Sequence, residues 1–273
     1  MKTGLLLSLV TLVGALVVSP AVQASKLSSI IASEHRSEEN RLRDKYRNPE
    51  EVIDFFGVEP SDNVLELWPG TGWYSEILAP YLKDTGNFFA ATFNLDNLNS
   101  GDKRDAYWSK IAKKYVEKMS DAGLYGDVRF ATFDKGQIDG SIGEQEIDVA
   151  LIIRSIHIWD ERGELASGLS EVFRVLKPGG TLGIIQHRAN SVSELASTAV
   201  DGYMDERYVI NAAEKAGFKL VASSEINRNL KDTKDHPKGV YTLPPTLAMG
   251  QTDREKYQSI GESDRMTLKF VKP

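Results

Sequence analysis

Short apolar runs alternate with amphipathic segments along most of this chain. Apolar runs typical of buried strands occur at residues 64–66, 87–93, 128–133, 146–153, 181–187, 218–226 and 266–272. Between several of them, apolar residues recur every three or four positions, which predicts helices at residues 74–82, 102–119, 164–176 and 205–216. This alternation predicts an α/β fold in which most strands pair in parallel and right-handed crossovers connect them.

The segment 64–73, V-L-E-L-W-P-G-T-G-W, joins the first predicted strand to the first helix. Gly70 and Gly72 lack a Cβ, so the backbone can turn sharply and a ligand can lie against amides at the helix N-terminus. Glu66 can accept hydrogen bonds there from a cationic or hydroxylated ligand. Several classes of nucleotide-binding protein share such a glycine turn, and it can also serve only for packing helix on strand. No Gly-Lys-Ser/Thr follows, which argues against a P-loop.

The spacing of this loop resembles the acidic-x-Gly-x-Gly-x-Gly signature of class I S-adenosylmethionine (SAM) dependent methyltransferases. It reads E-L-W-P-G-T-G at residues 66–72, with Trp68 in place of the first glycine, so the indole must be packed away or cover the ligand. Leu-Lys-Pro-Gly-Gly at 176–180 also resembles a turn of this family, and the flanks resemble a group of predicted, often exported bacterial methyltransferases. The resemblance implies a Rossmann-like seven-stranded sheet with an antiparallel last strand, helices on both faces, and SAM as cofactor.

The resemblance also implies a cofactor site along several strand ends. It places the methionine end of SAM against Glu66 and the loop residues Pro69, Gly70, Thr71 and Gly72. It places the ribose at Asn94, where the family usually has an acid and where an amide can still accept from one hydroxyl and donate to the other. The adenine would meet Asp134, with Phe133 over its ring. Arg154, directly after the run 146–153, is a further candidate for cofactor binding.

His157 follows the buried run 146–153, at the edge of the sheet where open α/β folds bind ligands. An unperturbed histidine has a pKa near neutrality and can take a proton from an acceptor hydroxyl, amine or thiol. A histidine between Ile156 and Ile158 can equally be a packing residue. His187, after the next strand, is the second candidate base. The motif Asn/Asp-Pro-Pro-Tyr/Phe is absent here, which argues against amino groups of DNA, RNA or protein as acceptors.

In the resembling family, the segment ahead of the first strand often covers the acceptor pocket. Residues 25–60 are strongly charged and helical in character, and we expect them to form such a lid before the SAM-binding domain at 61–273. Solvated surface is the alternative for any one of these side chains. The candidates for contact with the substrate are His35, Arg36, Tyr46, Arg47 and Arg188, the last of which follows the predicted strand at residues 181–187.

Two segments stand apart from the alternating pattern. In residues 1–24, Lys2 precedes the apolar segment 4–18, and Val22-Gln23-Ala24 offers small residues for cleavage. This predicts a signal peptide cleaved after Ala24 and a periplasmic or secreted protein, with an uncleaved N-terminal anchor as the alternative. Residues 227–264 form a long polar insertion, which we expect to be a flap over the acceptor site or to be disordered.

Composition narrows the possible functions of the 273-residue chain. Its formal net charge of −6 and the lack of a long basic run give no support for nucleic-acid binding. The absence of cysteine excludes disulfides, thiolate catalysis and thiolate metal sites. No metal is expected, because the histidines include no helix-spaced pair of ligands. Oligomeric state is not predicted.

Three functions fit these patterns to different degrees. The leading hypothesis is methyl transfer from SAM to a small-molecule acceptor. The first alternative is an exported binding protein that has kept the fold without catalysis, because Trp68 and Asn94 depart from the signature and SAM is not expected where the chain is exported. The second is a nicotinamide-dependent reductase, which fits the glycine loop but lacks an acid closing the second strand.

Overall fold

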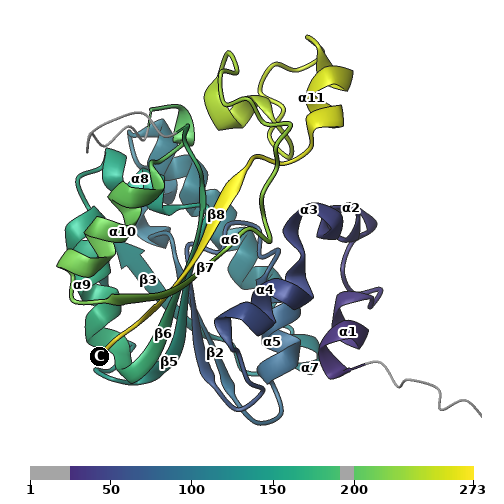
Figure 1. Ribbon diagram of the computed structural model, residues 1–273. Helices are drawn as coiled ribbons and strands as arrows, with labels where there is room; N and C mark the ends of the chain where they lie inside the picture. Colours follow the sequence, from purple (N-terminus) through teal and green to yellow (C-terminus); the bar gives the residue numbers. More distant parts are fainter. Residues whose placement is uncertain (1–24, 191–199) are drawn as a thin grey trace, which may run out of the picture.

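The computed structural model describes residues 25–190 and 200–273, in which eight strands form one sheet (Figure 1). The predicted signal peptide at 1–24 lies outside the described residues. The strands are β1 (Asn63–Leu67), β2 (Asn87–Thr92), β3 (Arg129–Asp134), β4 (Gln137–Ile138), β5 (Ile147–Ile153), β6 (Leu176–His187), β7 (Lys219–Ser224) and β8 (Arg265–Val271). Their order across the sheet is β4-β3-β2-β1-β5-β6-β8-β7.

The pairing confirms a mostly parallel sheet whose last strand is antiparallel. Strands β3, β2, β1, β5 and β6 pair in parallel, whereas β8 runs antiparallel to both β6 and β7. The predicted number of seven strands is wrong by one, because β4 forms a short antiparallel hairpin with β3 at the edge of the sheet. A strand of two residues is too short to leave a periodic pattern in the sequence.

Helices cover both faces of the sheet. They are α1 (Lys26–Ile31), α2 (Glu38–Leu42), α3 (Asp44–Arg47), α4 (Pro49–Phe56), α5 (Ser75–Leu82), α6 (Lys103–Met119), α7 (Ala122–Tyr125), α8 (Ile156–Glu161), α9 (Leu165–Val175), α10 (Glu206–Lys215) and α11 (Arg254–Ile260), with short 3₁₀ turns η1 (Leu95–Asn99), η2 (Val200–Gly202) and η3 (Gly239–Thr242). Within the described residues, no helix has the length and apolarity needed to cross a membrane.

Alternation along the central strands divides the core into two clusters. In β5, Val149 and Leu151 join the cluster under α4 and α5, while Ala150 and Ile152 join the cluster under α9 and α10. All four side chains are buried, as expected of a parallel strand covered on both faces. Because β3, β2, β1, β5 and β6 pair in parallel, their carboxyl ends lie at one edge of the sheet.

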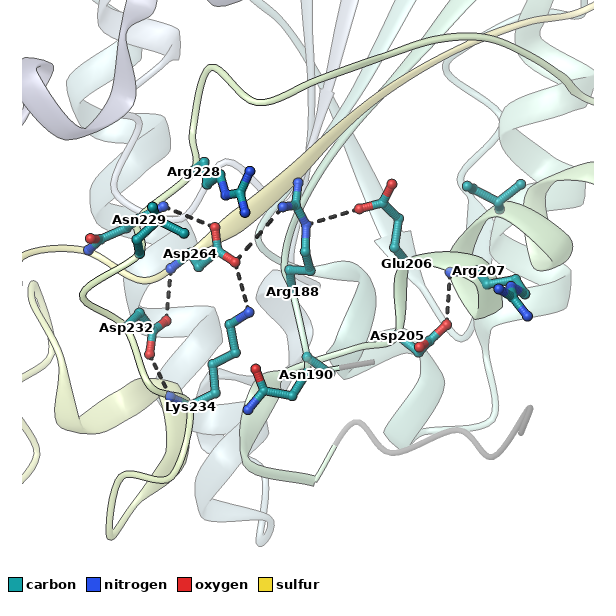
Figure 2. A pocket seen from close by; sticks show the side chains of 13 residues that line it. Arg188, Asn190, Asp205, Glu206, Arg207, Arg228, Asn229, Asp232, Lys234 and Asp264 are labelled. Carbon is teal, nitrogen blue, oxygen red and sulfur yellow. Dashed lines mark hydrogen bonds and ion pairs between the residues drawn. The ribbon is translucent and has the colours of Figure 1, made fainter. Parts of the chain in front are cut away.

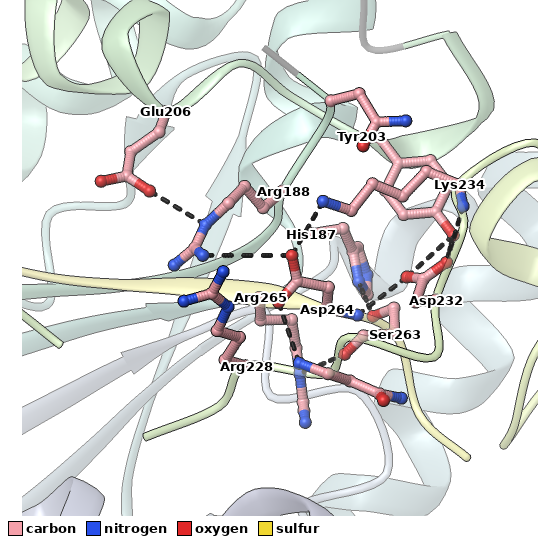
Figure 3. A network of polar contacts seen from close by, with 12 residues as sticks. His187, Arg188, Tyr203, Glu206, Arg228, Asp232, Lys234, Ser263, Asp264 and Arg265 are labelled. Carbon is pink, nitrogen blue, oxygen red and sulfur yellow. Dashed lines mark hydrogen bonds and ion pairs between the residues drawn. The ribbon is translucent and has the colours of Figure 1, made fainter. Parts of the chain in front are cut away.

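The predicted insertion has a defined path and reaches back to the sheet. The buried carboxylate of Asp232 accepts hydrogen bonds from the backbone amides of Lys234 (3.0 Å) and Asp264 (2.8 Å) (Figure 2). It also accepts from the Tyr203 hydroxyl at 3.0 Å (Figure 3). His236 Nε2 lies 2.9 Å from the same carboxylate. The Asp232 side chain thus joins both ends of the insertion to the chain between η2 and α10. A role of the insertion as a flap over the acceptor site stays a prediction.

Candidate functional site

A cavity of about 290 Å³ lies at the carboxyl ends of the central strands. Its walls come from six parts of the chain that are distant in sequence. They are the end of the N-terminal helices, the β1–α5 loop, the end of β2 with α6, the β5–α8 join, the last residue of β6 and the insertion. This is the edge where the sequence predicts a ligand site.

The two glycines of the β1–α5 loop have different structural roles. Both have a positive φ, 61° at Gly70 and 82° at Gly72. A Cβ added at Gly70 would meet no atom within 4 Å, and Gly70 lines the cavity together with Pro69 and Thr71. A Cβ at Gly72 would lie 2.8 Å from the ring of Tyr115, and Gly72 does not line the cavity. Gly70 therefore leaves room for a ligand, whereas Gly72 leaves room for packing.

The indole of Trp68 is packed into the floor of the cavity. Its Nε1 donates to the carbonyl of Phe133 at 2.9 Å, and its ring stacks on Phe93 with centroids 4.3 Å apart. Phe93 in turn stacks on Trp108 at 4.8 Å, and Trp68, Phe93 and Trp108 all line the cavity. Phe133 lies behind this aromatic wall, stacked on Trp159 at 4.3 Å, and does not line the cavity.

The residues predicted for ribose and adenine contact each other outside the cavity. Asn94 Nδ2 donates to Asp134 Oδ2 at 3.2 Å, and Asn94 Oδ1 accepts from the backbone amide of Asp96 at 2.9 Å. Neither Asn94 nor Asp134 lines the cavity. Both functional ends of the Asn94 amide are thus engaged within the protein, and the roles of both residues in cofactor binding stay predictions.

Glu66 is a buried acid on the cavity wall. It is 3% exposed and accepts a hydrogen bond from the Ser75 hydroxyl at 2.6 Å. Burial raises the pKa of its carboxyl to about 7, although the bond from Ser75 and the nearby charge of Arg47 oppose the shift. Near neutral pH the side chain can therefore exchange between a neutral acid and a carboxylate.

Both predicted bases line the cavity, with ring centroids 5.6 Å apart. His157 Nδ1 lies 3.3 Å from Gln186 Oε1, which can only accept, so we assign the proton to Nδ1. Its Nε2 then accepts from the Tyr241 hydroxyl at 3.1 Å. His187 Nδ1 lies 2.5 Å from the Ser263 hydroxyl (Figure 3).

Burial changes the titration of these two histidines. It lowers the pKa of His157 to about 4 and that of His187 well below the ordinary value of 6.5. The shift follows from burial, because an imidazolium ion in this enclosed site would lose its hydration. Both rings are neutral at pH 7, and each still has the lone pair of a neutral imidazole to accept a proton.

We expect His157 to make the protein sensitive to acid. Because its pKa is lower in the folded chain, the unfolded chain takes up a proton between pH 6.5 and 4, and the stabilisation present above pH 6.5 is lost over that range. The loss attributable to His157 is about 3 kcal/mol by pH 4. Urea unfolding of His157→Gln should show a shallower decrease over the same range, and an unchanged slope would contradict this account.

Of the candidates for substrate contact, the structure brings only Arg47 to the cavity. His35 Nε2 contacts the Glu76 carbonyl at 2.8 Å, and the fully buried Arg36 forms a bidentate pair with Asp44. Tyr46 lies outside the cavity, and its carbonyl accepts from Arg265.

Arg188 lies in a separate polar cleft, although it follows His187 directly in the sequence (Figure 2). Its guanidinium forms ion pairs with Glu206 and Glu225, both at 2.9 Å. It is therefore not positioned to act together with His187 in the cavity.

A buried acid that the sequence analysis does not single out is Glu262, at the end of the insertion. Its carboxylate is 1% exposed and lies between the guanidinium groups of Arg43, Arg47, Arg154 and Arg265. Arg154, a predicted cofactor residue, lines the cavity and has a positive φ of 61°. Glu262 is 215 residues from Arg47 along the chain, so no local pattern could have indicated this pairing.

No family model matches the chain. One curated relative is the ubiquinone/menaquinone biosynthesis C-methyltransferase UbiE of Vibrio parahaemolyticus, which is 27% identical over 152 residues. The match covers 56% of this chain and 51% of that protein, so the chain spans about half the length of the curated relatives it matches.

Solved structures resemble the chain over most of its length. A SAM-dependent methyltransferase from Aquifex aeolicus has a TM-score of 0.56 at 18% identity, over 85% of this chain and 93% of that one. A geranyl diphosphate methyltransferase in complex with SAM has a TM-score of 0.55 at 13% identity, over 90% and 94% of the two chains. The chain therefore has the Rossmann-like α/β fold of SAM-dependent methyltransferases.

Proposed function

We propose that this protein is a SAM-dependent methyltransferase that acts on a small-molecule acceptor. The observation that carries the proposal is the cavity at the ends of β1 and β5, where the open backbone of Gly70 lies beside a buried acid and two neutral histidines. Fold alone does not determine chemistry, so the proposal depends on these side chains. The relative UbiE is named for C-methylation in quinone biosynthesis, which agrees with a small acceptor.

The residues of the cavity fit the parts of SAM. The space above Gly70 and Thr71 would receive the methionine end, and Glu66 would pair with its ammonium group. Trp68, Phe93 and Trp108, whose rings stack on one another, would give the purine an apolar wall. When bound, SAM would supply an electrophilic methyl group on its sulfonium.

The protein's own contribution would be positioning and proton transfer. His157 and His187 face the cavity as neutral imidazoles and are the candidates to accept the proton that an acceptor hydroxyl, amine or thiol loses on methylation. Tyr241 bonds His157 Nε2 from the insertion, so the insertion controls access to that nitrogen. Most of the rate would come from holding acceptor and methyl group in line.

Calorimetry with S-adenosylhomocysteine (SAH), the product form of the cofactor, tests the proposal. We expect binding that is about tenfold tighter at pH 8 than at pH 6, because the ammonium group of SAH requires the carboxylate form of Glu66, whose pKa is about 7. Glu66→Gln should bind more weakly and without this pH dependence. A folded protein that binds neither SAM nor SAH would instead favour the binding protein that has kept the fold without catalysis.

A further inference from the structure

Four guanidinium groups surround the single carboxylate of Glu262. The Nε atoms of Arg43 and Arg47 lie 2.8 and 2.9 Å from its oxygens. Nη1 of Arg265 lies 3.1 Å away and Nη1 of Arg154 lies 3.5 Å away. We call these five residues the arginine cluster. Each of its arginine side chains is at most 20% exposed, so water screens the repulsion between them poorly.

The positive charge of the arginine cluster faces the cavity. Arg43, Arg47 and Arg154 line the cavity, whereas Glu262 and Arg265 lie behind them. Four cations and one anion leave a formal excess of three positive charges. Glu66 also lines the cavity, but its pKa of about 7 leaves it about half ionised at pH 7, so an excess of positive charge remains.

Arg154 shows that this excess is not balanced within the protein. In the described part of the chain, its buried Nε has no hydrogen-bond partner. Burial and the neighbouring charge of Arg47 lower the pKa of Arg154 to about 9, even though Glu262 opposes the shift. Buried charges are normally paired, so the Arg154 side chain, 20% exposed at the cavity wall, has donor capacity left for a further anion.

We propose that the methyl acceptor carries an oxyanion, a carboxylate or a phosphate, which binds to Arg43, Arg47 and Arg154 of the arginine cluster. This inference rests on the proposed function. Bound SAM has one carboxylate against an ammonium and a sulfonium, so it brings a net charge of +1 and increases the excess. Guanidinium groups bind planar and tetrahedral oxyanions through paired N–H donors, which suits an acceptor of this class.

Titration of the purified protein with inorganic phosphate, and separately with acetate, at constant ionic strength tests the inference. We expect one anion to bind with and without saturating SAH, with affinities within threefold of each other. Arg154→Gln should weaken that binding at least tenfold, while Arg154→Lys, which keeps the charge, should retain part of it. The stronger of the two anions identifies the oxyanion of the acceptor.

Arg188→Gln is the matched control, because Arg188 is already paired with carboxylates in the separate cleft (Figure 2). It should leave anion binding unchanged, and Tm values of all variants report on folding. Competition between the anion and SAH would overturn the inference, since the arginine cluster would then hold the cofactor's own carboxylate. No binding of either anion would overturn it too. Anion binding without any SAH binding would remove the proposed function, and with it the assignment to a methyl acceptor.

Discussion

Arginine in place of Gly70 should weaken SAH binding at least 100-fold. The new side chain starts from a point with no atom within 4 Å and extends into a cavity of about 290 Å³, where it displaces the ligand. It also adds a cation beside Arg47 and Arg154. The positive φ of 61° costs about 1–2 kcal/mol for any residue with a Cβ, which a folded domain can tolerate. Calorimetry with SAH measures the effect.

Gly179→Arg separates loss of the cavity from strain in the backbone. Gly179 also has a positive φ, 79°, and a Cβ there would likewise meet no atom within 4 Å. It lies near the start of β6 (Leu176–His187), far in sequence from the β1–α5 loop and not on the cavity wall. We expect a similar decrease in Tm but unchanged affinity for SAH. If Gly70→Arg binds SAH within threefold of the unchanged protein, the cavity is not the cofactor site.

The fold could be predicted because its signals are local. Strand β5 is a nearly continuous apolar run, and α6 begins at Lys103 after the capping side chain of Asp102, within one residue of the predicted start. Both features depend on neighbours a few positions away along the chain. The antiparallel direction of the last strand was predicted only from the family resemblance. The direction in which two strands pair is not a local property of the sequence.

The composition of the cavity wall could be predicted only in part. The sequence identifies Glu66, Gly70 and His157, which stand at strand ends that every parallel sheet brings together. It does not distinguish Gly70 from Gly72, because the difference is the ring of Tyr115 on α6. The sequence predicts that the indole of Trp68 is packed away or covers the ligand, but it does not show which residue holds the indole. In the structure the carbonyl of Phe133, 65 residues further along the chain, accepts the hydrogen bond from the indole.

The lowered pKa of His157 could not be predicted from the sequence, for a related reason. Its ordinary value near neutrality assumes contact with water, and the sequence gives no measure of burial for a single polar residue. His157 is 2% exposed, and its ring contacts Gln186 on β6 and Tyr241 of the insertion, both distant in sequence. Likewise, Glu262 belongs to a segment that reads as polar loop, and only the fold encloses it among arginines.

Replacing Glu262 with glutamine should lower the free energy of unfolding by about 3–5 kcal/mol. The amide keeps the shape of the side chain but removes the negative charge, so buried guanidinium groups of Arg43, Arg47, Arg154 and Arg265 lose their common partner. Removing one side of a buried ion pair has a cost of this size, because the charge that remains is neither hydrated nor compensated. Urea unfolding at pH 7 measures the difference.

Glu225→Gln is the control for this result, because Glu225 also pairs with arginine but its side chain is 55% exposed. Its loss should cost less than about 1 kcal/mol.

The arginine charges hold the pKa of Glu262 well below its ordinary value of 4.5, so the stabilisation by Glu262 is complete above pH 4.5 and decreases as the pH falls toward the folded pKa. The gap between Glu262→Gln and the unchanged protein should therefore narrow in acid. Adding Arg154→Gln should restore part of the stability, because it removes one unpaired cation; a further loss in the double variant would show that repulsion among the arginines does not cause the effect.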